Sequence, residues 1–187
     1  INGVEGILSI SINTEVWPRV LNWAKFTRTT PGTAVSVSAG TKLVPQAQSV
    51  NGDINIFFTG TNGGWTPANT NANDNSTEDV AALVALIQKQ IANTKSDKYV
   101  VIGLTNGGTY AWDSLNAALA QAFGNRFLDA KAYLASMQAL NDAGIVPTET
   151  DLQFLGEGKI PLSLNCSPED TTHLSDVGYT LLAKQVY

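Results

Sequence analysis

The sequence predicts an α/β layered fold with a mostly parallel sheet. Two short apolar segments, 53–59 and 98–104, have the composition of strands, and a stretch with helical spacing of apolar residues follows each of them. Strands that alternate with helices form parallel sheets whose faces are covered by those helices. The apolar residues run almost without interruption in both segments, which is typical of strands buried on both faces.

The predicted elements follow one another from the first of these strands to the end of the chain. Three helices have recognisable ends, because Ser76 and Ser175 stand at N-cap positions and Gly124 follows the last residue of a helical pattern. In chain order the elements are strand 53–59, helix 76–93, strand 98–104, helix 112–123, strand 127–129, helices 131–142 and 148–156, and helix 175–187.

The segment 13–50 differs from the rest of the chain. Residues 33–40 alternate small polar and apolar side chains, as exposed antiparallel strands do. We therefore expect 13–50 to form a β-rich insertion within a single domain that spans 1–187. Residues 61–76 are rich in Asn, Gly and Thr and are expected to form a long polar loop, and such loops in compact domains are often functional.

Composition argues against several classes of function. The formal net charge is −5 at pH 7, and we expect no nucleic-acid partner because phosphate binding needs a basic face. No apolar run approaches the ~20 residues of a membrane-spanning helix, so we expect no membrane contact. The single cysteine, Cys166, excludes an internal disulfide and a cysteine-based zinc site, and we interpret it as a small packing residue. With one histidine in the chain, no metal centre is expected, and no cofactor is implied.

The one histidine of the chain, His173, follows an aspartate, Asp170, by three residues. A carboxylate beside an imidazole fixes the ring tautomer and stabilises the imidazolium, as a general base for a serine nucleophile requires. On spacing alone, a structural surface histidine in front of a capped helix is the more common case. The motifs elsewhere in the chain change this balance.

The tetrapeptide Thr-Asn-Gly-Gly occurs twice, at 61–64 and 105–108, each time after a predicted strand. Asn-Gly favours tight turns, which explains the repeat without any function. Alternatively, both turns lie at the carboxyl ends of parallel strands, where ligands bind in open α/β sheets. For Asn106 we favour the turn interpretation.

Three segments, taken in order, resemble the SGNH hydrolase superfamily, the GDSL-type esterases and lipases. They are Asn-Gly-Val-Glu-Gly-Ile-Leu-Ser at 2–9, Phe-Thr-Gly-Thr-Asn at 58–62, and Asp-Thr-Thr-His-Leu at 170–174 with Gly-Tyr at 178–179. The resemblance covers most of 1–12 and 50–187, and the last segment is its specific part. It implies a three-layer, flavodoxin-like fold.

The resemblance also assigns roles to four residues. Gly6 corresponds to the glycine whose backbone N–H enters the oxyanion hole, and Asn62 to the asparagine whose side-chain amide enters the same hole. Asp170 and His173 correspond to the acid–base pair. Acyl transfer needs a nucleophile, a base, a group that orients the base and donors to the developing oxyanion, and these four residues supply all but the nucleophile.

The chain departs from the family pattern in three places. It contains no Gly-Asp-Ser motif, so the nucleophilic serine is expected in a segment upstream of Ile1. Gly63 stands where many members have aspartate, and 13–50 is an additional segment. Ser9 and Ser11 lie close to the glycine motif, but a serine or threonine at that point is ordinary in the family and serves structure.

The resemblance implies a serine esterase that hydrolyses carboxylic esters through an acyl-enzyme, with His173 as general base and then acid. The polar loops dotted with aromatic residues suggest O-acetyl groups on a polysaccharide as the substrate. The pattern is similar to members from phage tails and bacterial envelopes, so we expect a secreted, envelope or virion-associated protein. Two alternatives remain open: a non-catalytic carbohydrate-binding or structural module of a larger assembly such as a phage tail, and an acyltransferase.

Three of the four tryptophans are candidates for stacking on a sugar. Trp17 and Trp23 lie in the predicted insertion and Trp65 lies in the polar loop. An indole ring offers a large apolar face with a polar edge, which suits a pyranose ring. Packing is the more common role of tryptophan and remains the alternative for all three.

Overall fold

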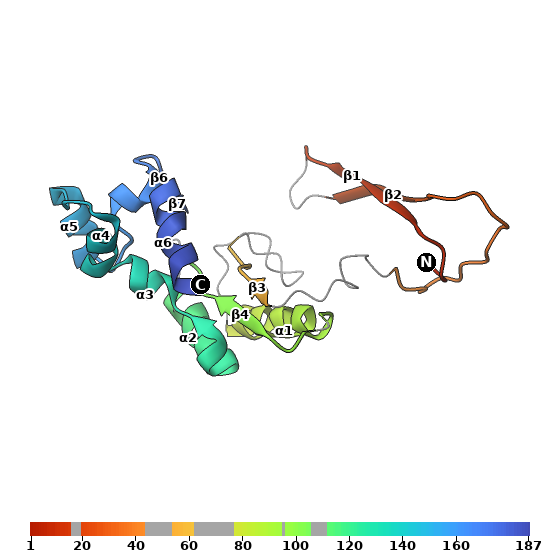
Figure 1. Ribbon diagram of the computed structural model, residues 1–187, viewed down its shortest axis with the longest axis horizontal. Helices are drawn as coiled ribbons and strands as arrows, with labels where there is room; N and C mark the ends of the chain where they lie inside the picture. Colours follow the sequence, from red (N-terminus) through yellow and green to blue (C-terminus); the bar gives the residue numbers. More distant parts are fainter. Residues whose placement is uncertain (16–19, 44–53, 62–76, 95, 106–111) are drawn as a thin grey trace. The chain divides into compact units, whose positions relative to one another are not determined.

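The computed structural model describes residues 1–15, 20–43, 54–61, 77–94, 96–105 and 112–187 (Figure 1). The chain divides into two compact units, Ile1–Asn51 and Gly52–Tyr187. The division falls after Asn51, so the first residues of the chain share a unit with the segment predicted to be an insertion. Each unit is described by itself below.

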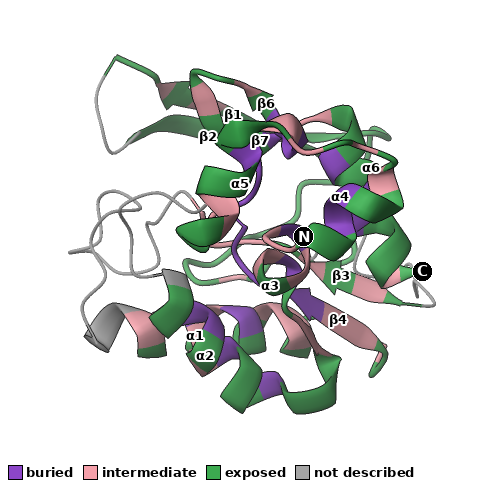
Figure 2. Cartoon of the chain, turned by 90° about the vertical axis from the view of Figure 1, so that its left-hand side faces the viewer, coloured by how far each residue is buried: buried purple, intermediate pink, exposed green. Residues whose placement is uncertain are grey.

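The first unit contains a two-stranded antiparallel ribbon. Strand β1 (Gly6–Asn13) pairs with strand β2 (Val20–Arg28), and a bulge interrupts the register after Ser11. Most residues of the ribbon are exposed (Figure 2). β2 supplies part of the β structure predicted for 13–50. The alternating residues 33–40, however, form no strand. Alternation gives a segment the side-chain pattern of a strand, but a strand also needs a second segment with which its backbone can pair.

The second unit is built on a three-stranded parallel sheet. The strand order is β3 (Asn55–Phe57), β4 (Tyr99–Ile102) and β5 (Phe127–Leu128), with both pairs parallel. The predicted α/β class with a parallel sheet is therefore confirmed. The prediction that both apolar strands are buried on both faces holds for β4 but is wrong for β3, where Ile56 is 55% exposed. β3 lies at the edge of the described sheet. An edge strand has a neighbouring strand on one side only, so fewer side chains cover it than cover the central strand β4.

Helices connect and follow these strands, close to the predicted positions. They are α1 (Thr77–Ala92), α2 (Trp112–Phe123), α3 (Ala130–Leu134), α4 (Met137–Ala143), α5 (Glu149–Gly156) and α6 (Asp176–Val186). The single helix predicted over 131–142 is two helices, because Ser136 leaves the helical conformation and caps α4. None of the helices in the described ranges is long and apolar enough to cross a membrane.

A second hairpin precedes the last helix, in a region for which the sequence predicts no helix or strand. Strand β6 (Asn165–Ser167) pairs with β7 (Asp170–Leu174) in an antiparallel arrangement. A short 3-10 turn, Leu162–Leu164, leads into β6. Both strands are short and largely polar, so they carry no periodic apolar signal from which they could be predicted.

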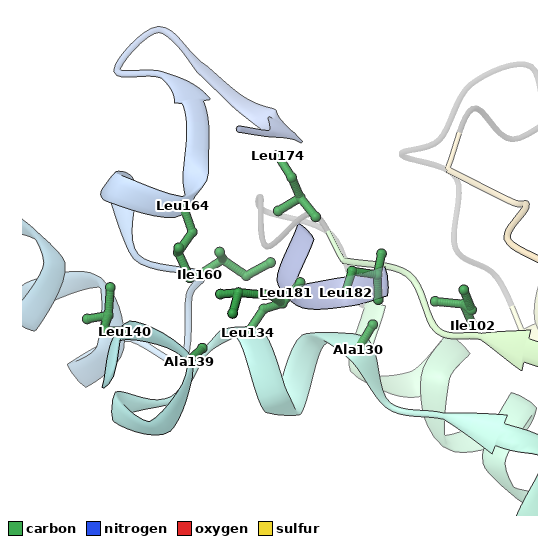
Figure 3. Packing of buried hydrophobic residues seen from close by; sticks show 10 residues of the cluster. All are labelled: Ile102, Ala130, Leu134, Ala139, Leu140, Ile160, Leu164, Leu174, Leu181 and Leu182. Carbon is green, nitrogen blue, oxygen red and sulfur yellow. The ribbon is translucent and has the colours of Figure 1, made fainter. Parts of the chain in front are cut away.

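Helices pack on both faces of the parallel sheet. Successive side chains of a strand point to opposite faces, and accordingly Val101 and Ile102 belong to different cores. Val101 packs with buried residues of α1 and α2, which are Leu83, Ile87, Leu115, Leu119 and Phe123, together with Leu104. Ile102 belongs to the cluster drawn in Figure 3, which joins α3, α4 and α6 to the chain around β6 and β7: Ala130, Leu134, Ala139, Leu140, Ile160, Leu164, Leu174, Leu181 and Leu182.

Candidate functional site

The hairpin of β6 and β7 brings Asp170 and His173 together. Asp170 stands opposite Ser167 at the turn, and the Ser167 hydroxyl accepts a hydrogen bond of 3.1 Å from the Asp170 backbone N–H. At the other end of β7, Leu174 is buried in the core cluster of Figure 3. The short strand is thus held at both ends, and His173 lies next to its buried end.

The two side chains are joined by direct hydrogen bonds. Nδ1 of His173 lies 2.8 Å from Oδ2 of Asp170 and 3.1 Å from Oδ1. The same Oδ1 accepts the backbone N–H groups of Thr172 and His173, each at 3.1 Å. The predicted pair of Asp170 and His173 is therefore in contact, as the spacing of three residues suggested.

These contacts favour one tautomer of the neutral His173 ring. The hydrogen bond from the His173 ring, with those from the His173 and Thr172 backbone, lowers the pKa of Asp170 below its ordinary value. An ionised carboxylate can only accept hydrogen bonds, so a neutral ring must carry its proton on Nδ1. The lone pair of Nε2 is then available, and an imidazole in this tautomer is a general base.

The pair is open to solvent. The side chain of His173 is 66% exposed and that of Asp170 is 37% exposed. Among the residues that the structure describes, none donates to or accepts from Nε2. A nucleophile or a substrate can therefore reach Nε2 without displacing a partner of the ring within these residues.

Gly6, the predicted backbone donor to an oxyanion, lies in the first unit at the start of β1, opposite Arg28. The structure gives a packing reason for a glycine here. A Cβ at this position would lie 2.5 Å from the carbonyl oxygen of Thr27 and would also collide with the ring of Phe26. Ser9 and Ser11, considered as nucleophiles, lie on the same strand.

Of the four other predicted site residues, the structure describes only Trp23. Asn62, the second oxyanion donor, lies outside the described residues, as do Trp17 and Trp65. Trp23 lies on β2 opposite Ser11 and is 51% exposed. This exposure is compatible with stacking on a ligand.

Cys166 does not pack in the core, contrary to the prediction. Its neighbour on β6, Asn165, is buried and donates from its side-chain amide to the carbonyl groups of Ile160 and Pro161 at 3.3 Å. Successive residues of a strand point to opposite faces, so Cys166 is exposed. Within the described ranges, no three His, Cys, Asp or Glu side chains are grouped so that they could hold a metal ion.

Sequence reasoning missed one buried charged group, Asp151. Its side chain accepts hydrogen bonds from the backbone N–H and hydroxyl of Thr148, at 2.9 and 2.8 Å, and from the same two groups of Ser163, both at 2.8 Å. Burial by itself raises the pKa of Asp151, but these bonds from Ser163 and Thr148 outweigh it, and the net shift is downward. Thr-x-x-Asp has the spacing of a capping box, which was the available signal.

A cavity of about 380 Å³ lies between α2 and α3. Alanines of both helices form much of its wall, and Asp113, Asp129 and Lys131 supply charges. Lys131 pairs with Asp113 at 2.6 Å, so these two charges largely neutralise each other. Of the predicted site residues that the structure describes, none lines this cavity, and Asp170 and His173 are among those absent from its wall.

In comparisons with known proteins, no family model, no curated protein and no solved structure matches the chain.

Proposed function

We propose that this chain belongs to an SGNH-type serine esterase, which hydrolyses carboxylic esters through an acyl-enzyme. The hydrogen bond of 2.8 Å between His173 Nδ1 and Asp170 Oδ2 is the observation that carries the proposal. It places a carboxylate beside Nδ1 of an exposed imidazole, which is the arrangement that orients the general base of a serine hydrolase.

The pair would act in both halves of the reaction. In the first, Nε2 of His173 takes the proton of the serine hydroxyl as the serine oxygen bonds to the ester carbonyl carbon. The imidazolium, stabilised by Asp170, then donates that proton to the leaving alcohol as the ester C–O bond breaks. In the second half, Nε2 takes a proton from water as the water oxygen bonds to the acyl carbon. The imidazolium then returns that proton to the serine oxygen as the bond between the acyl carbon and the serine breaks, which releases the acid.

The remaining parts of the site come from the family resemblance. The nucleophile of the proposal belongs to a Gly-Asp-Ser motif, which residues 1–187 do not contain. The backbone N–H of Gly6 and the side-chain amide of Asn62 are proposed as donors to the oxyanion, where losing one donor typically costs about 10²–10³ in turnover. A parallel sheet with helices on both faces is compatible with the three-layer, flavodoxin-like fold that the proposal requires.

For the substrate we propose O-acetyl groups on a polysaccharide, in a secreted, envelope or virion-associated setting. The exposed indole of Trp23 supports a sugar ligand, since stacking on a pyranose needs an accessible aromatic face. The same exposed ring favours the second candidate function, a carbohydrate-binding module without catalysis. An acyltransferase differs from the esterase only in the acceptor, which is a sugar hydroxyl in place of water.

The test uses the protein expressed from its complete gene and p-nitrophenyl acetate as substrate. Replacing His173 by alanine should lower turnover by about 10³-fold or more, because the base is lost. Thr172→Ala is the matched control, since Thr172 is an exposed neighbour that contributes only its backbone N–H to the pair. A serine-directed phosphonate, followed by mass spectrometry, should label one serine.

The outcomes separate the candidate functions. Turnover that survives His173→Ala would contradict the esterase. A complete protein that shows no turnover, but binds an acetylated polysaccharide through a surface weakened by Trp23→Ala, would favour the binding module. Transfer of the acetyl group to an added sugar, detected by mass spectrometry, would identify an acyltransferase.

A further inference from the structure

Helix α6 begins at a serine whose hydroxyl joins two parts of the fold. The Ser175 hydroxyl accepts the Gly178 backbone N–H at 3.2 Å and donates to the Leu164 carbonyl oxygen, also at 3.2 Å. The Ser175 backbone N–H donates to the same carbonyl at 2.9 Å. Gly178 lies so close to this carbonyl that a Cβ on Gly178 would be 2.5 Å from it. The start of α6 therefore packs against one backbone carbonyl, that of Leu164, and is hydrogen-bonded to it.

That carbonyl is itself firmly held. Leu164 has no exposed surface and its side chain points into the core cluster (Figure 3). The preceding residue, Ser163, gives both its backbone N–H and its hydroxyl to the buried Asp151 at 2.8 Å. An anchor that is packed on one side and hydrogen-bonded on the other has little freedom to move.

Only Leu174 separates Ser175 from His173 along the chain. The other end of β7 is held by the bond between Ser167 and the Asp170 backbone. We propose that the Ser175 hydroxyl is a positioning group for His173. By hydrogen-bonding to the Leu164 carbonyl oxygen, it fixes the end of β7 and keeps Nδ1 of His173 within hydrogen-bond distance of Asp170. Its importance for catalysis rests on the proposed function, whereas the positioning itself is measurable without any turnover.

The chain contains a matched control for this proposal. Ser136 makes the same pair of bonds at the start of α4, where its hydroxyl donates to the Tyr133 carbonyl at 2.6 Å and accepts the Ala139 N–H at 3.3 Å. Replacing either serine by alanine therefore removes one helix cap and one bridge to a carbonyl. Only Ser175 is adjacent to the end of β7, so a general effect of cap loss and a specific effect on His173 are separable.

The measurement is the ¹⁵N and ¹H NMR signature of the imidazole, which is unambiguous because the chain has one histidine. In the wild type, the ring should be protonated on Nδ1 and bonded to Asp170. Ser175→Ala should convert this signature into a mixture of both tautomers, whereas Ser136→Ala should leave it unchanged. Ser175→Thr, which keeps a hydroxyl at the cap, should restore it.

Activity of the complete protein provides the second readout. Ser175→Ala should lower kcat by roughly tenfold with little change in KM, less than the 10²-fold that a 1 Å misplacement of a catalytic group can cost. A wild-type tautomer signature in folded Ser175→Ala would overturn the proposal, whatever its stability. Should this variant not fold, Ser175→Asp retains a cap of equal quality but has no donor for the Leu164 carbonyl, and an unchanged signature in it would overturn the proposal equally.

The two proposals fail in different ways. If the complete protein hydrolyses no ester but Ser175→Ala changes the tautomer of His173, the proposed function fails and the positioning role stands. If the protein is an esterase and Ser175→Ala leaves both the tautomer and kcat unchanged, only the positioning role fails.

Discussion

Two aspartates of the second unit, Asp151 and Asp170, differ in their surroundings, and the proposed function gives them different roles. Both are held by backbone N–H groups, and hydrogen bonds lower the pKa of both. Asp151 has no exposed surface, and its partners are all neutral groups of Thr148 and Ser163. Asp170 has a side chain that is 37% exposed, and its shortest bond is to the imidazole of His173.

The comparison shows how burial and hydrogen-bond partners differ between a carboxylate that stabilises the fold and one that is proposed to orient a catalytic base. A buried carboxylate without a counter-ion stays ionised only when neutral groups donate hydrogen bonds to its oxygens. Those oxygens are then not available to bind another side chain. An exposed carboxylate keeps part of its hydration and needs fewer protein donors. Its hydrogen bond to a histidine ring can therefore favour one tautomer of that ring. Changes at Asp151 should therefore affect stability, and changes at Asp170 should affect chemistry.

The largest effect is expected from Asp170→Asn in the complete protein. The amide can offer an N–H toward Nδ1, which reverses the preference of the imidazole and protonates Nε2. Turnover of p-nitrophenyl acetate should fall by up to about 10⁴-fold, as is typical for loss of the orienting carboxylate. The midpoint of urea unfolding should change little. A variant that retains most of its turnover would remove Asp170 from the proposed mechanism.

Asp151→Asn should have the opposite profile. An asparagine in this position keeps one acceptor oxygen, but its NH₂ group replaces the other and leaves at least one of the four donors facing a donor instead of an acceptor. We expect a loss of about 3 kcal/mol in the free energy of unfolding, measured with urea. Asp142→Asn is the control, because this exposed carboxylate also accepts two side-chain bonds, from Tyr133 and Gln138. Equal losses in the two variants would contradict a special role for burial.

The pH dependence of stability sharpens the same contrast. The pKa of Asp151 is lower in the folded chain than its ordinary value of 3.8, so the unfolded chain binds more protons. Its stabilising contribution is fully present above about pH 4 and is lost as the pH falls through the folded-state pKa. Wild-type stability should thus fall steeply below that pH, and the slope should be smaller in Asp151→Asn. An unchanged slope would assign the acid sensitivity to other carboxylates, Asp170 among them.

The smallest effect concerns two glycines in helices. Gly178→Ala places a Cβ 2.5 Å from the Leu164 carbonyl, and backbone cannot yield as a flexible side chain can. We expect a loss of about 1–2 kcal/mol, although alanine is normally the better helix former. Gly156→Ala, near the end of α5 with no atom within 4 Å of the new Cβ, should instead gain up to about 0.5 kcal/mol. Thermal unfolding measures both, and a gain in Gly178→Ala would show that α6 is not seated on this carbonyl.

The sequence by itself determined those features that depend on residues close together in the chain. Periodic apolar positions and caps predicted the helices of the second unit, including α6 behind Ser175. The spacing between Asp170 and His173 allowed a contact between them, because three residues can bring two side chains together within a hairpin as well as within a helix. Spacing alone still favoured a structural histidine, and the acid–base role came from the resemblance.

Other features were decided by the tertiary structure, because they depend on residues that are distant in the chain. The alternating segment 33–40 found no ladder partner, and the polar residues of β6 and β7 pair without any apolar pattern. Asp151 became a buried ion only when Ser163, twelve residues further along the chain, supplied two donors. Local sequence encodes conformational preference and capping, but a partner for a strand, or a donor for a buried charge, exists only once the chain has folded.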